Sequence, residues 1–146
     1  MSETPAEALQ ELTDEFELLG DWEERYRHVI DLGRQLEPLP EDERTEENKV
    51  RGCASQVWLA SRPGPTGALQ FRGDSDAHIV RGLIAILLRF YSGRRADEIL
   101  AFDAKAALAQ LGLASALSSQ RSNGLVAMIQ RIRRDAEAQQ IQPAGA

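Results

Sequence analysis

Cysteine is the scarcest informative residue type in this chain. The 146 residues include only one cysteine, Cys53, so no disulfide can form within the chain. Zinc sites built from paired cysteines are excluded for the same reason. A metal site would have to combine Cys53 with His28, His78 and carboxylates, and neither histidine lies near Cys53 in the sequence. We therefore expect no metal, and a lone cysteine favours a reducing cytoplasmic compartment.

Positive charge and long apolar runs are also scarce. The chain has 17 basic and 23 acidic residues, which gives a formal net charge of −6. Nucleic acids and anionic membrane surfaces are bound mainly through basic patches, so neither is an expected partner. The longest apolar stretch, Leu83–Leu88, is too short to cross a bilayer, and the first residues lack the pattern of a secretory signal. No internal repeat and no phosphate-binding glycine loop is visible.

Apolar residues spaced three or four apart predict helices in both halves of the chain. The expected helices cover residues 5–19, 22–36, 77–92, 95–102 and 104–111, with a last one starting near residue 122. Thr4, Asp21 and Asp103 occupy N-cap positions. Gly82 is expected to allow a close approach of another element to the most apolar of these helices.

Alternating apolar residues predict a small sheet in the middle of the chain. The strands Gln56–Arg62 and Leu69–Arg72 form a hairpin around a proline-rich turn, and Lys49–Arg51 is the candidate third strand. Gly73–Asp76 is expected to be a turn and helix start, in which Asp74 or Ser75 caps the helix. The predicted fold class is α+β: one domain over 1–146, with about three antiparallel strands packed against several helices and frayed ends at 1–4 and 139–146.

Cys53 is predicted at the tip of a tight loop that leads into the first strand. Gly52 lets the backbone turn sharply before it and is the candidate hinge of the loop. Lys49 and Arg51 favour a thiolate at Cys53, whereas the acidic run Glu41–Glu47 opposes it, so the direction of any pKa shift stays open. The acidic run itself is either a solvated segment or part of a docking surface.

Several roles for Cys53 follow from the residues alone. The thiol could be a small buried hydrophobe, as free cysteines often are. It could be the nucleophile of a hydrolase, for which only His28 and His78 could serve as the base. Without a dedicated base, its chemistry would be an exchange at sulfur, in which the thiolate itself is the reacting group.

Four motifs in order carry a family resemblance. They are Val50–Leu59 (VRGCASQVWL), Phe71–Ala77 (FRGDSDA), Ile79–Ala85 (IVRGLIA) and Ser119–Leu125 (SQRSNGL). With these motifs, the chain resembles the SufE family of sulfur acceptors from about Trp22 to about Ile132. The proline-rich turn and the tail after Glu137 lie outside the strongest matches.

The resemblance implies a role as well as a fold. Cys53 would accept sulfur from a cysteine desulfurase as a persulfide, stimulate that enzyme, and pass the sulfur to an iron–sulfur scaffold. Pyridoxal phosphate is expected in the desulfurase only, and no cofactor is expected on this chain. Arg51, Gly52, Asp76 and Arg121 are the candidate hinge or partner contacts; Arg121 is either a structural clamp or a neighbour of the sulfur site. A non-catalytic module that activates a desulfurase remains the main alternative.

Overall fold

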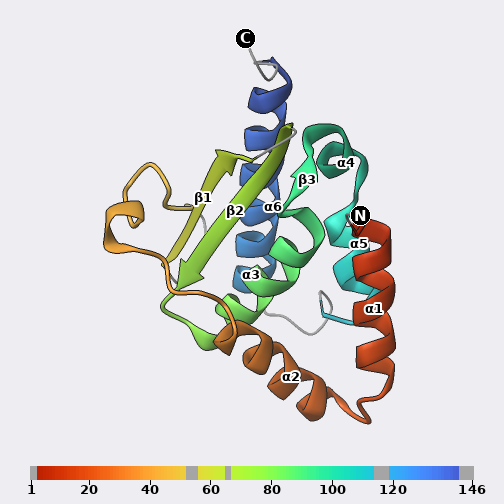
Figure 1. Cartoon of the computed structure of the whole chain (residues 1–146). Helices are drawn as coiled ribbons and strands as arrows, with labels where there is room; N and C mark the ends of the chain where they lie inside the picture. Colours follow the sequence, from red (N-terminus) through yellow and green to blue (C-terminus); the bar gives the residue numbers. More distant parts are fainter. Residues whose placement is uncertain (1–2, 52–55, 65–66, 114–118, 142–146) are drawn as a thin grey trace.

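The structure is a computed structural model that describes residues 3–51, 56–64, 67–113 and 119–141. For residues 119–123 and 141 it gives the course of the helix only. The described residues form an α+β domain in which helices pack against a three-stranded antiparallel sheet, as the sequence predicted (Figure 1). Gly52, Cys53, Ala54 and Ser55 lie outside the described residues.

The sheet consists of β1 (Val57–Pro63), β2 (Ala68–Ser75) and β3 (Arg94–Arg95), in that order. β1 and β2 pair from Val57 with Ser75 to Pro63 with Leu69, which confirms the predicted hairpin. The predicted third strand, Lys49–Arg51, is found only in part: Lys49 forms an isolated antiparallel bridge with Trp58 of β1, whereas the third strand of the sheet is β3, beside β2. A two-residue strand has too few residues to show an alternating pattern, so the sequence could not indicate it.

The inner face of the hairpin is apolar. Val57 and Leu59 of β1 are buried, as are Leu69 and Phe71 of β2. Because side chains alternate between the two faces of a strand, these four residues point to the same side, where α3 (His78–Tyr91) contacts β2. Burial of this face fixes the register, since a one-residue slip would turn every apolar side chain outward.

Local capping defines the helices before and after the sheet. They are η1, a single 3-10 turn (Glu41–Glu43), and the α-helices α1 (Pro5–Glu17), α2 (Trp22–Arg34), α4 (Ala96–Ala101), α5 (Ala104–Gln110) and α6 (Ser119–Ile141). Thr4, Asp21 and Asp103 each accept a hydrogen bond from the third residue of α1, α2 and α5, so the predicted N-caps are confirmed. Gly93 and Gly112 have a φ of +78° directly after helical segments, a conformation that favours glycine.

α3 is the centre of the core. It contacts β2, α1, α2 and α6, and nine of its fourteen residues are buried. At Gly82 a Cβ would lie only 2.1 Å from the backbone oxygen of Val29 in α2. The predicted close approach at Gly82 is therefore confirmed, and α2 is the element that approaches.

α6 is longer at both ends than the sequence predicted. It begins at Ser119, about three residues before the start that the sequence predicted near residue 122. It continues to Ile141, into the part expected to be frayed. The Arg133 guanidinium donates to the carbonyl oxygen of Leu100 at 3.1 Å, which joins α6 to α4.

Candidate functional site

The two ends of the segment that contains Cys53 lie side by side. The Val50 amide donates to the carbonyl oxygen of Val57 at 2.8 Å, and the Leu59 amide donates to that of Asn48, also at 2.8 Å. Residues 48–50 thus extend the sheet next to β1. The last described residues before the cysteine segment and the first ones after it are therefore held at one place on the edge of the sheet.

Asp76 makes a second connection at the far end of this segment. Its Oδ1 accepts from the Gln56 amide at 3.0 Å, and its own amide donates to the carbonyl oxygen of Gln56 at 3.3 Å. Asp76 lies between β2 and α3, so it ties the start of β1 to the junction of two other elements. Asp76 is one of the predicted contact residues, and the structure places it in direct contact with Gln56, the first residue described after Cys53.

The predicted capping role of the neighbouring residues was wrong. Asp74 and Ser75 belong to β2, and α3 starts at His78 after Ala77, which makes no side-chain cap. Ser75 Oγ accepts from the Ala77 amide at 3.2 Å, but this bond lies before the helix. The strand continues through these residues because Asp74 is satisfied by partners from distant parts of the chain.

Asp74 is the most buried charged residue described, with no exposed area. Its Oδ2 accepts from Arg44 Nη2 at 2.6 Å and from the Leu39 amide at 3.2 Å. Its Oδ1 accepts from Arg81 Nη1 and from the Ser75 amide. A carboxylate with four donors compensates much of the cost of burying its charge. We call Asp74, Arg44 and Arg81 the Asp74 clamp.

The Asp74 clamp fixes the chain that leads to Cys53. The Arg44 guanidinium also lies over the Trp58 ring, 5.0 Å from its centre, and Arg72 Nη1 pairs with Glu43 Oε2 at 3.2 Å. These contacts hold η1 and the residues around it against the polar face of the sheet. Part of the acidic run is thereby used for folding, since Glu43 is paired within the molecule.

Arg51 lies at the start of the undescribed segment and is exposed. Its Nη2 pairs with Glu46 Oε2 at 3.0 Å, and both side chains are about three-quarters exposed. Such a surface pair contributes about 0–1 kcal/mol, so Arg51 is held only weakly. It can turn toward another carboxylate at little cost.

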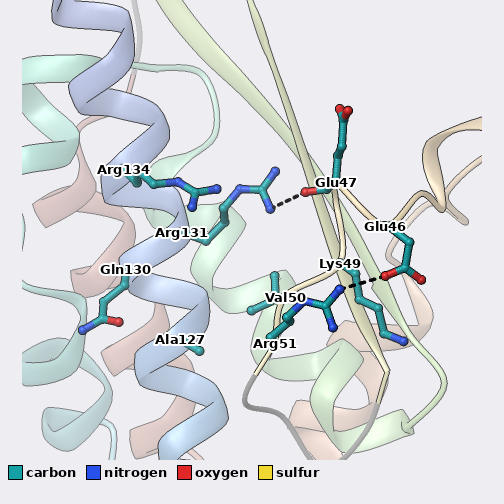
Figure 2. A pocket seen from close by; sticks show the side chains of 9 residues that line it. All are labelled: Glu46, Glu47, Lys49, Val50, Arg51, Ala127, Gln130, Arg131 and Arg134. Carbon is teal, nitrogen blue, oxygen red and sulfur yellow. Dashed lines mark hydrogen bonds and ion pairs between the residues drawn. The ribbon is translucent and has the colours of Figure 1, made fainter.

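A hollow of about 490 Å³ opens between α6 and the residues that precede Cys53 (Figure 2). Its lining consists of Glu46, Glu47, Lys49, Val50, Arg51, Ala127, Gln130, Arg131 and Arg134. Arg131 joins the two walls: its Nη1 donates to the carbonyl oxygen of Glu47 at 3.0 Å and its Nε to Asp135 Oδ1 at 3.3 Å. Arg51, the last residue described before the cysteine segment, is part of this lining.

Comparison with known proteins identifies the family. The family model described as "SufE: Fe-S metabolism associated domain" matches residues 10–136 of this chain. The chain belongs to the SufE family. This membership confirms the resemblance seen in the sequence and gives the chain a role in iron–sulfur metabolism, with a sulfur-related partner such as a cysteine desulfurase.

Relatives and a solved structure agree with this assignment. Two uncharacterised SufE-like proteins, from Rhizobium etli and Rhizobium meliloti, are each 53% identical to this chain over 133 residues. The aligned part covers 89% of this chain, and 90% and 95% of the two relatives. The solution structure of a hypothetical protein from Thermus thermophilus has a TM-score of 0.75 at 17% identity, and the match covers 92% of this chain and 96% of that one. That likeness shows that the fold is shared.

Other predicted features of this SufE-family chain have separate outcomes. Gly52 and Cys53 lie outside the described residues, and Arg121 lies in α6 with its side chain undescribed, so their roles stay predictions. His28 Nε2 lies 3.2 Å from Glu15 Oε2, which engages this histidine with α1. Over the described ranges, no group of three or more His, Cys, Asp or Glu residues could hold a metal ion, and no helix could span a membrane.

The sequence did not reveal the Asp74 clamp or the hollow. Arg44, an arginine within an acidic run, was one signal for the clamp, because an isolated cation there needs a nearby or distant carboxylate. Asp74, one of two aspartates in Phe71–Ala77, was a second signal, but its neighbours favoured a turn. The hollow is formed by residues about 80 positions apart, which no local pattern can indicate.

Proposed function

We propose that this SufE-family chain carries sulfur on Cys53 between a cysteine desulfurase and a protein that assembles iron–sulfur clusters. The observation that carries the proposal is the joining of Val50 to Val57 and of Asp76 to Gln56 around the segment that holds the only cysteine. Each residue spans at most about 3.6 Å of extended chain, so Cys53 lies within about 11 Å of Val50. The covalent chain therefore limits how far Cys53 can lie from this edge of the sheet.

The proposed reaction is a thiol exchange at sulfur. The desulfurase holds a persulfide, Enz–S–SH, formed from free cysteine with the help of its own pyridoxal phosphate. The Cys53 thiolate attacks the terminal sulfur, the S–S bond breaks, and the enzyme's cysteine leaves as a thiolate. Cys53 then carries the persulfide, and an attacking thiolate of the acceptor removes the sulfur by the same exchange.

The residues next to Cys53 in the sequence suit this exchange. A hydrolase would need a general base near the thiol; His28 is engaged with Glu15 of α1, which leaves His78, the first residue of α3, as the base that a hydrolase would have to use. Exchange needs only a thiolate and access to the partner's sulfur, and Lys49 and Arg51 precede Cys53 by four and two positions. We therefore propose that the chain acts as a carrier and that its partner performs the cofactor chemistry.

Intact mass spectrometry under non-reducing conditions tests the proposal. After incubation with a cysteine desulfurase and free cysteine, the chain should gain the mass of one sulfur atom and lose it on reduction. The Cys53→Ser variant should gain none. If that variant still stimulated the desulfurase and sulfur still reached the acceptor, the chain would be a non-catalytic activating module instead.

We further propose that Gly52 serves as a hinge that lets Cys53 extend toward a docked partner. A persulfide is easily oxidised, so a shielded resting position would protect it. Hydrogen exchange of Val50–Ser55, measured alone and with the desulfurase, is the test. Equal exchange in both states would contradict the hinge but would leave the sulfur transfer itself intact.

A further inference from the structure

The hollow between α6 and residues 46–51 has a charge opposite to that of the whole chain. The chain has a net charge of −6, whereas four cations and two carboxylates line the hollow, an excess of two positive charges. The cations are Lys49, Arg51, Arg131 and Arg134, and the carboxylates are Glu46 and Glu47. A concave surface with an excess of one sign concentrates the electric field, so this region should attract anionic groups more strongly than the rest of the acidic chain does.

Two of these cations are used within the molecule. Arg131 is mostly buried, with 13% of its side chain exposed, and it bonds to Asp135 and to the backbone of Glu47. Arg51 pairs with Glu46. Figure 2 shows the Arg131 contact crossing from α6 to Glu47 and the Arg51–Glu46 pair on the chain that faces α6, so of these two contacts only the first ties the two walls together.

The other two cations are available. Arg134 is exposed and Lys49 is half-buried, and within the described ranges neither side chain has a hydrogen bond or ion pair. Figure 2 shows Arg134 extending from α6 toward Glu47. Val50, which is 6% exposed, and the half-buried Ala127 supply an apolar part of the lining. The site thus offers cations beside an apolar surface, between walls that are already fixed.

We propose that this hollow docks an acidic segment of the cysteine desulfurase that loads Cys53. The inference rests on the proposed function. A volume of about 490 Å³ is within the usual range of sites for short peptides and drug-sized ligands, and is much larger than one small anion needs. Arg51 lines the hollow two residues before Cys53, so the backbones of these two residues are at most about 7 Å apart and an occupant would contact the chain next to the cysteine segment.

Attraction between the cations of the hollow and an acidic segment of the desulfurase would bring the two reacting sulfurs together. Cations at the rim of an interface act mainly on the rate of association and on its salt dependence. An acidic segment in the hollow would pair with Arg134 and Lys49 and place its own protein next to the Cys53 segment. The weak Arg51–Glu46 pair could open to add a third contact.

Loading kinetics with charge-reversed variants test the inference. The measurement is the rate at which Cys53 gains sulfur from a cysteine desulfurase and free cysteine, over a range of chain concentrations. Arg134→Glu and Lys49→Glu should each raise the half-saturating concentration about tenfold at low salt, about 1.4 kcal/mol, with the maximal rate unchanged. The difference should shrink as salt is added, because salt screens exposed charges.

Lys105→Glu is the matched control for Lys49→Glu. Lys105 is exposed on α5, and its replacement changes the net charge by the same amount. The control should load like the wild-type chain, and circular dichroism should show the same helix content in all variants. An equal effect of Lys105→Glu would mean that only net charge matters and would overturn the inference.

The remaining outcomes are distinct. An unchanged half-saturating concentration in both Arg134→Glu and Lys49→Glu, with normal loading, would overturn the docking surface while sulfur transfer stands. If these two variants were loaded normally but released sulfur to glutathione more slowly, the hollow would instead bind a small anionic thiol, and the docking inference would also be overturned. If the wild-type chain gained no sulfur at all, the proposed function itself would fail, and the docking inference with it.

Discussion

Replacing Asp74 by asparagine should destabilise the protein more than any other isosteric change at a described aspartate. Asp74 is fully buried and accepts from Arg44, Arg81 and two backbone amides. The asparagine keeps the size of the side chain but removes its charge and replaces one acceptor oxygen with a donor. Arg81 would then lose its ion pair, and Arg44 would keep only the contact with the exposed Glu41 at 4.0 Å.

The size of the effect follows from burial. Removing one partner of a fully buried ion pair costs about 3–5 kcal/mol. Arg44 and Arg81 keep 26% and 22% of their side chains exposed, so water can solvate part of their charge. We therefore expect a loss at the lower end of this range, about 3 kcal/mol of unfolding free energy, which lowers Tm by about 6–12 °C for a domain of this size.

Urea unfolding followed by circular dichroism measures this loss, and Asp76→Asn is the matched control. Asp76 is exposed, and its contact with the Gln56 amide can be kept by the asparagine oxygen, so we expect a loss below about 1 kcal/mol. Hydrogen exchange should also rise at the Leu39 amide in Asp74→Asn, because this amide donates to the carboxylate. A loss below about 1 kcal/mol in Asp74→Asn would refute the reasoning that the clamp is a main support of the sheet.

Two further predictions concern the core. Gly82→Ala should destabilise the protein by about 1–3 kcal/mol or more, because the new methyl group would meet the Val29 carbonyl oxygen and force α2 and α3 apart. A thermal unfolding curve unchanged from the wild type would contradict this. Burial raises the pKa of Tyr91 above its usual value of 10.0, so the folded state holds the phenolic proton more tightly than the unfolded state, and stability should fall as the pH rises above about 10. Tyr91→Phe should lower the unfolding free energy by about 1 kcal/mol at neutral pH, because it removes the hydrogen bond to the Phe102 carbonyl oxygen. Urea unfolding at several pH values should show that the unfolding free energy of this variant falls less steeply at alkaline pH. A fall as steep as in the wild type would show that Tyr91 is not its source.

Local features of the fold could be predicted because they depend on residues close together in sequence. Thr4, Asp21 and Asp103 cap helices through bonds to amides three residues away, and short side chains with oxygen acceptors suffice for that. The alternation of Val57 and Leu59 with residues that point to the other face of the strand indicated the hairpin in the same way. Gly82 could be recognised as a contact point, although the sequence did not show that α2 makes the contact.

Features that combine distant residues could not be predicted. β2 continues through Asp74 only because Arg44, thirty positions away, and Arg81 supply positive charge there, so a motif typical of a turn became a buried strand. β3 depends on its place beside β2 and not on its own two residues. The start of α6 at Ser119 also went against the polar composition of that segment, which favoured a connection.

The sequence by itself determined the family, the fold class and the one thiol available for sulfur exchange, because motifs and a residue count are properties of the chain. Tertiary structure alone decided what surrounds that thiol's segment. Asp76 reaches Gln56, and Arg131 crosses from α6 to Glu47, only after the hairpin and the helices have packed. Electrostatic contacts of this kind act through space, and the folded path of the chain sets which charges come within reach of each other.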